Sequence, residues 1–208
     1  MNYLIYGAAF IYLIICVLTI KKIKLNAKSM CIIGIVTAMT LVLRTIRVPL
    51  PTGASIALLG VLPPMLLALT YNCELAVLSG LISALLSIIV VPGYALVHPM
   101  QLFVEHIPAL SILGFAGVLG CEKKMNVIAA SLGVIIINVT FHIFSGAIFF
   151  GQYAPPGLGP WAYSITYNIS SHGVEGIIAV ILLSFMPLKN IKKVIGGRSY
   201  VINQESSK

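Results

Sequence analysis

The chain has 208 residues, of which 59% are hydrophobic and only 9% are charged, and its formal net charge is +8. A soluble domain has about a quarter of its residues charged, so this composition excludes an ordinary water-soluble protein. Because each bilayer crossing takes about 20 apolar residues, the length allows six or seven spans and excludes a soluble energy-converting domain beside them.

The positive charges lie at the ends of apolar runs. Basic clusters in such places orient membrane spans, whereas a nucleic-acid-binding groove would interleave basic and aromatic residues. We therefore predict that the chain is embedded in a lipid bilayer and binds no nucleic acid. The clusters are Lys21, Lys22, Lys24 and Lys28, then Lys123 and Lys124, then Lys189, Lys192, Lys193 and Arg198.

The first apolar run covers residues 3–20 and is followed by a basic linker. A signal peptide places its positive charge before the apolar core, so this order predicts an uncleaved span with its N-terminus outside. Further apolar runs follow at residues 30–43, 55–70, 75–91, 101–119, 127–150 and 173–187.

The basic clusters also predict the orientation of a multi-pass protein in a prokaryotic cell membrane. With all three clusters in the cytoplasm, the C-terminus is inside, and segments 44–54, 91–100 and 151–172 are outside. Only Arg44 and Arg47 oppose this arrangement, and we expect their long side chains to snorkel into the headgroups. The outer segments are long and rich in Pro, Gly and Tyr, which favours lids over a pocket that opens outward.

Glu105 is the acidic residue that lies about one turn inside an apolar run. A carboxylate there is unfavourable unless it is paired or lines a polar cavity, so it is a candidate functional residue. Gln101 lies four residues earlier, on the same helical face, and His98 and His106 flank the pair. The alternative is a structural hydrogen bond from Glu105 to a neighbouring helix.

A second polar stripe lies in the run at 127–150. Asn138, His142 and Ser145 recur at spacings of four and three, so they share one helical face and predict a cavity wall. Phe149 and Phe150 close the outer end of this run. A third cluster precedes the last run and consists of Trp161, Tyr163, Tyr167, Asn168 and His172, of which Trp161 also fits an interfacial aromatic belt.

These side chains suit a small heteroaromatic ligand with hydrogen-bonding edges, whose positive charge a carboxylate would balance. The sequence has no GxxxxGK[ST], GxSxG or HExxH motif, so we expect no ATP hydrolysis, no cofactor and no enzyme activity. His98, Glu105, His106 and His142 lack the spacing of a metal site. A membrane-embedded enzyme that uses Glu105 and His142 as acid and base remains the alternative from another class.

Three segments resemble the thiamine-specific substrate-binding (S) components of energy-coupling factor (ECF) transporters. They are GASIAL at 53–58 with Leu62-Pro63 after it, VHPMQLFVE at 97–105, and HIFSG at 142–146 followed by FFGQYAPPG at 149–157 and YSITYN at 163–168. The similarity covers about residues 30–188. It implies an all-α bundle of six membrane helices at 29–190, with an extra N-terminal helix and linker at 1–28 and a cytoplasmic tail at 191–208.

The resemblance implies a subunit that captures thiamine from outside and docks on a transmembrane coupling subunit with two ATP-binding-cassette ATPases. Gly34 and Ala38 match the family's small-residue docking patch. In the binding site, Glu105 matches the acidic ligand contact, His142, Tyr163 and Asn168 match other polar contacts, and Tyr94 matches a loop tyrosine.

The sequence also departs from the family pattern. His106 stands where the family has a tyrosine, and Phe150 stands where it has a ligand-stacking tryptophan. Trp161, Tyr94 and Phe149 are candidate replacements for that ring. The departures leave a thiamine precursor or another vitamin as alternative ligands.

Overall fold

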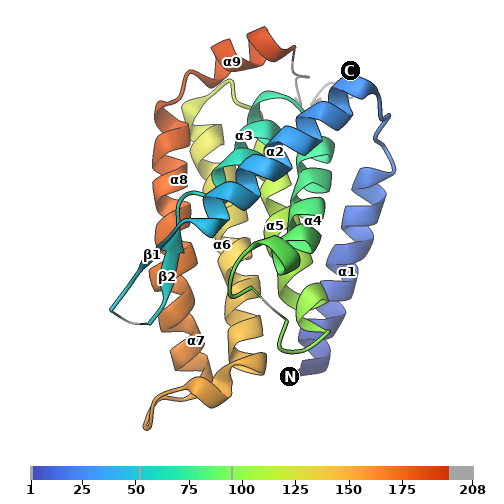
Figure 1. Ribbon diagram of the computed structural model, residues 1–208. Coiled ribbons are helices and arrows are strands. Elements are labelled where there is room, and N and C mark those ends of the chain that lie inside the picture. Colours follow the sequence, from blue (N-terminus) through green and yellow to red (C-terminus); the bar gives the residue numbers. More distant parts are fainter. Residues whose placement is uncertain (1, 52, 95, 197–208) are drawn as a thin grey trace, which may run out of the picture.

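The apolar runs form helices that pack side by side in a bundle (Figure 1), as a computed structural model of residues 2–51, 53–94 and 96–196 shows. The α-helices are α1 (Asn2–Ile20), α2 (Ala27–Thr45), α3 (Leu62–Thr70), α4 (Cys73–Val90), α5 (Ile107–Ser111), α6 (Lys124–Phe149), α7 (Pro160–Asn168), α8 (Val174–Phe185) and α9 (Leu188–Ile195). Two π-helical turns, η1 (Leu102–His106) and η4 (Ile169–Gly173), and two 3₁₀ segments, η2 (Ile112–Gly117) and η3 (Gly151–Tyr153), extend or join them.

Within the described residues, four helical segments are long and apolar enough to cross a membrane, by length and composition. They are Ala27–Thr45, Cys73–Val90, Lys124–Phe149 and the continuous Pro160–Phe185, and Leu4–Ile20 and Leu102–Gly117 are shorter apolar helices. The large apolar side chains that remain exposed on the bundle fit a lipid environment, because lipid and not water would surround them. The chain is therefore a multi-pass membrane protein with a helical fold.

Small residues let the central helices approach closely. A Cβ atom on Gly80 of α4 would lie 2.3 Å from the main-chain oxygen of Leu110 in α5, so only glycine fits there. Around this contact, Met65, Val77 and Leu113 are completely buried. In lipid, such close packing is the main source of helix association.

The sequence analysis took the run at 55–70 as one membrane span, but this run does not form a single helix. Residues before α3 instead form an antiparallel hairpin of β1 (Arg47–Pro49) and β2 (Ser55–Ala57), with Val48 opposite Ile56. Gly53, at φ +80°, lies in the connecting turn, in the left-handed region that glycine favours. The helix begins only where prolines fall in its first turn. The fold therefore contains a small sheet beside its helices.

The last crossing is longer than expected, since it begins at Pro160 and continues through η4 to Phe185. Pro160 is at the first helical position, where its fixed φ and missing N–H are tolerated. The expected outer segment 151–172 is thus largely helical. The expected tail at 191–208 begins within α9, and Arg198 of the third basic cluster lies outside the described residues.

The basic clusters gather at one end of the bundle. The Lys28 ammonium donates to the Ile195 carbonyl at 3.3 Å, and Lys192 pairs with Glu122 at 3.1 Å. These contacts join the start of α2, the turn before α6 and helix α9, which lies across this end of the bundle (Figure 1). The hairpin and the loop after α4 are at the opposite helix ends.

A candidate small-molecule site at the end of the bundle opposite the basic clusters

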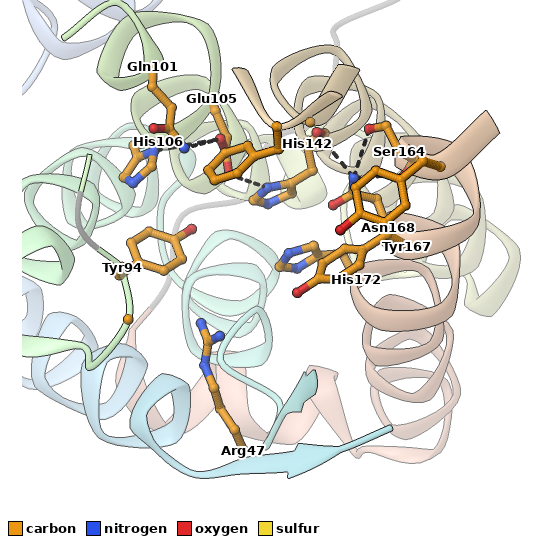
Figure 2. Close-up of a pocket in the computed structure, with 14 residues that line it drawn as sticks. Arg47, Tyr94, Gln101, Glu105, His106, His142, Ser164, Tyr167, Asn168 and His172 are labelled. Carbon is orange, nitrogen blue, oxygen red and sulfur yellow. Dashed lines mark hydrogen bonds and ion pairs between the residues drawn. The ribbon is translucent and has the colours of Figure 1, made fainter. Parts of the chain in front are cut away.

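A cavity of about 200 Å³ lies among the helix ends opposite the basic clusters. Figure 2 shows its side chains converging from several elements. The lining residues are Arg47, Gly93, Tyr94, Gln101, Glu105, His106, His142, Gly146, Phe150, Tyr163, Ser164, Tyr167, Asn168 and His172.

The π-helical turn η1 presents Glu105 and His106 to this cavity. Pro108, near the start of α5, explains the wide turn, because it has no N–H to donate to the carbonyl of Val104 and its ring would clash with that carbonyl. The Ile107 N–H instead bonds to the Leu102 carbonyl, five residues back. Single π turns of this kind often occur at functional sites.

Glu105 is held by side chains from two helices. Its carboxylate accepts from Gln101 Nε2 at 3.0 Å and lies 2.9 Å from His142 Nδ1, and Ser145 Oγ also donates to it. His106 Nδ1 is 4.0 Å away. The sequence analysis paired Gln101 with Glu105 and His142 with Ser145 from their spacing. In the structure these two pairs face each other across the contact between η1 and α6.

A second buried carboxylate lies deeper in the bundle. The His142 ring stacks on His172, with centroids 3.7 Å apart and planes within 4°. His172 Nδ1 is 3.9 Å from the carboxylate of Glu175, which also accepts from the Val61 main-chain N–H at 3.2 Å. Glu175 is only 1% exposed, and the sequence analysis did not include it in the site.

Arg44 does not snorkel into headgroups, contrary to expectation. It is 1% exposed, and its guanidinium donates to the Tyr94 hydroxyl and lies 4.7 Å from the centre of that ring. Burial raises the pKa of the Tyr94 phenol, although the charge of Arg44 opposes this, so the hydroxyl stays protonated. Arg47 is nearby, lines the cavity and donates to Ser55 Oγ at 3.3 Å. The sequence analysis assigned neither arginine to the site.

The opposite wall of the cavity joins α6 to α7. Asn168 Nδ2 donates to the Ser164 carbonyl at 2.9 Å and to the His142 carbonyl at 3.3 Å. A Cβ atom on Gly146 would lie 2.3 Å from Ser164 Oγ, so glycine permits this close contact. Phe150, Tyr163 and Tyr167 add rings to the same wall.

Two residues that the sequence analysis proposed for the cavity are not among those that line it. Trp161 is absent from the cavity lining and packs edge-on against Phe144, at a centroid distance of 6.0 Å. Asn138 is 1% exposed and donates to the Ala109 carbonyl at 2.7 Å, so it links α6 to α5 below the cavity. The predicted polar stripe therefore divides into a structural residue and two residues at the site.

Some buried polar atoms at the cavity make no hydrogen bond within the described part of the chain. They are both ring nitrogens of His106 and Nε2 of His142. Buried polar groups are nearly always paired, so these atoms are exceptions among the polar groups around the cavity. No cluster of metal-binding side chains occurs among the described residues.

The fold and the site together define a class: a multi-pass helical membrane protein with a polar, ring-lined cavity for a small molecule at one end. Comparison with known proteins narrows this class. The family model described as "Thiamine transporter protein" matches residues 30–195, so the chain belongs to that family.

Individual relatives agree with this assignment. The thiamine transporter ThiT of Bacillus subtilis is 27% identical over 169 residues, which cover 74% of this chain and 87% of that protein. ThiT of Lacticaseibacillus paracasei is 27% identical over 155 residues, covering 67% and 77%. The solved structure of ThiT from Listeria monocytogenes has a TM-score of 0.64 at 27% identity and covers 80% of this chain and 96% of that one.

A second solved structure, of the S component of a bacterial ECF transporter, is 19% identical with a TM-score of 0.52 and covers 74% of this chain and 92% of that one. At this identity it supports the fold alone. Since the family is one of transporters, the chain is a transporter and the enzyme alternative is wrong.

Proposed function

We propose that this chain is the S component of an ECF-type transporter and captures thiamine in the cavity around Glu105. The observation that carries the proposal is the carboxylate of Glu105, held at 2.9 Å from His142 in a member of the thiamine transporter family. Thiamine combines an aminopyrimidine, whose ring nitrogen and amino group can form hydrogen bonds, with a positively charged thiazolium ring. Both features suit a carboxylate surrounded by aromatic side chains.

Each residue of the cavity has a role in this proposal that follows from its polar or aromatic side chain. Glu105 and His142 bind the hydrogen-bonding edge of the pyrimidine, and the free nitrogens of His106 lie beside them. Phe150 and Tyr163 offer flat faces for the rings, and Asn168 fixes the backbone that carries His142. Tyr94 closes the cavity from the loop after α4.

The ligand alternatives follow from the rings that the cavity offers. Trp161 packs against Phe144 and lies outside the lining, so Phe150 and the tyrosines carry the stacking in this protein. A phenyl or phenol ring stacks less strongly than an indole, which keeps a thiamine precursor as the second candidate ligand.

Transport requires an energy source that this chain obtains from partners. We propose that it docks on a transmembrane coupling subunit carrying two ATPases. The docking surface is a groove between α2 and α4 that contains Gly34 and Ala38, and a Cβ on Gly34 would meet no atom within 4 Å. The N-terminus is outside and the C-terminus is cytoplasmic, since the basic clusters share one end of the bundle.

The proposal is tested by thiamine binding to the purified chain in detergent, without ATP or partner proteins. Glu105→Gln should weaken binding at least about tenfold, because a hydrogen bond to a charged group contributes about 1.5–3 kcal/mol. The matched control is Glu122→Gln at the cytoplasmic end, which should leave the Kd unchanged. Equal Kd values for Glu105→Gln and the wild type would refute this site.

Competition identifies the ligand more closely. Thiamine, its pyrimidine half and riboflavin are offered to the same preparation. Displacement by thiamine at the lowest concentration supports the proposal, whereas equal displacement by the pyrimidine half points to a precursor. Preference for riboflavin would contradict the assignment.

A further inference from the structure

Helix α1 lies outside the segment that matches the family, since the match begins at residue 30 and α1 ends at Ile20. Figure 1 shows α1 running alongside α4 and α5. The residues that it buries are Ile5, Ala9, Tyr12 and Cys16, at 7%, 3%, 8% and 1% exposure. Their spacing of four, three and four places them on one helical face. Large apolar side chains such as Leu4, Phe10 and Ile11 are exposed elsewhere on α1.

The outer half of this face contacts the turn that carries Glu105. Ile5 and Ala9 form a buried cluster with Val104, which is 0% exposed and immediately precedes Glu105 in η1. Phe149 and Trp161 pack against the same cluster. This explains the position of Trp161: it joins α1 to α7 behind the cavity.

The inner half of α1 is held by polar contacts. The Tyr12 hydroxyl lies 3.0 Å from Ser111 Oγ, and Cys16 Sγ lies 3.5 Å from the same oxygen. Ser111 Oγ also donates to the Ile107 carbonyl at 2.6 Å, directly after the π turn. The Tyr12 ring lies 5.4 Å from Phe141 in α6. The position of α1 is thus fixed on both sides of η1.

We propose that α1 is a positioning element for the binding site: it supports the π turn η1 from behind and thereby fixes the direction in which Glu105 enters the cavity. A π turn is a less regular backbone than an α-helix, and its geometry depends on what packs against it. Ala9 and Tyr12 are the positioning residues. The inference rests on the proposed function, since it concerns the residue that binds thiamine.

Ala9→Leu tests the proposal by adding bulk where α1 meets Val104. Small displacements of a binding group are costly, so thiamine binding should weaken about tenfold. The matched control is Ala8→Leu: Ala8 is the neighbouring residue, is exposed, and should leave the Kd unchanged. If Ala9→Leu does not give folded protein, Tyr12→Phe takes its place, since it keeps the ring and removes only the contact with Ser111.

A double-mutant cycle with Glu105→Gln separates positioning from mere structural support. If α1 acts through Glu105, Ala9→Leu should change the Kd less than about twofold once Glu105 is already Gln. An equal loss in both backgrounds, or no loss in the Glu105 background, overturns the inference. Failure of the wild-type chain to bind thiamine would instead overturn the proposed function.

Discussion

Asn138 and His142 are one turn apart on α6 but have different surroundings. His142 lies against Glu105 and lines the cavity, whereas Asn138 donates to the Ala109 carbonyl on α5. The sequence placed both on one helical face, and this is correct. Only the depth at which α5 crosses α6 decides which of them lines the cavity.

This difference predicts opposite phenotypes. Asn138→Ala removes an interhelical hydrogen bond, which contributes about 0.6 and at most about 1.7 kcal/mol in membrane proteins. The variant should unfold at lower denaturant concentration, with its thiamine Kd within about twofold of the wild type, since Asn138 is not among the residues that line the cavity. His142→Ala should weaken binding about tenfold, because it removes the imidazole that lies 2.9 Å from the Glu105 carboxylate. Unfolding curves in detergent and equilibrium binding measure both variants.

At the scale of the element, the π turn η1 is the feature that combines Glu105 and His106 in one cavity. Its cause is Pro108, which cannot donate to the carbonyl four residues earlier. Pro108→Ala restores that donor, so the segment can relax toward a regular α-helix and rotate Glu105 away from His142. Thiamine binding should therefore weaken about tenfold, although alanine is the better helix former.

The control for this change is Pro160→Ala. Pro160 is at the first position of α7, where its missing N–H has no helical partner in any case. This variant should bind thiamine like the wild type. If Pro108→Ala also binds normally, the π turn is not needed for the site.

The elements also show where sequence reasoning succeeds and fails. Apolar runs identify membrane helices because a chain that crosses the bilayer must satisfy its backbone hydrogen bonds internally. The runs that form α1, α2, α4 and α6 were therefore predicted with nearly the right bounds. The hairpin β1–β2 was missed, because its apolar residues read as part of a span and its turn depends on local backbone geometry. The early start of α7 was missed because its aromatic and polar residues resemble an interfacial loop.

At the scale of the whole molecule, the site depends on contacts between segments far apart in the sequence. Glu105, His142 and Asn168 were found because each is a polar group in or beside an apolar run, where burial without a partner is unfavourable. Arg44 was placed at a headgroup because nothing local indicates Tyr94, which comes from another loop. Trp161 was assigned to the ligand because its packing on Phe144 depends on how α6 and α7 lie together.

The same bundle separates its two proposed tasks, since the thiamine cavity and the α2–α4 groove share no lining residue. Gly34 and Ala38 lie in the groove, and a Cβ atom on Gly34 would meet no atom of the described residues within 4 Å. Gly34→Leu should therefore leave the fold and the thiamine Kd of the isolated chain unchanged. It should block close approach of a partner helix, because small residues allow that approach.

The expected result is a separation of binding from uptake. Gly34→Leu should lower thiamine uptake by cells that express the coupling subunit and its ATPases, and the variant should no longer copurify with them. Ile35→Leu is the matched control, because Ile35 is 61% exposed and is not among the residues that line the groove. Normal uptake by Gly34→Leu would contradict docking at this groove, whereas loss of thiamine binding by the isolated variant would mean that the two ends of the bundle are coupled.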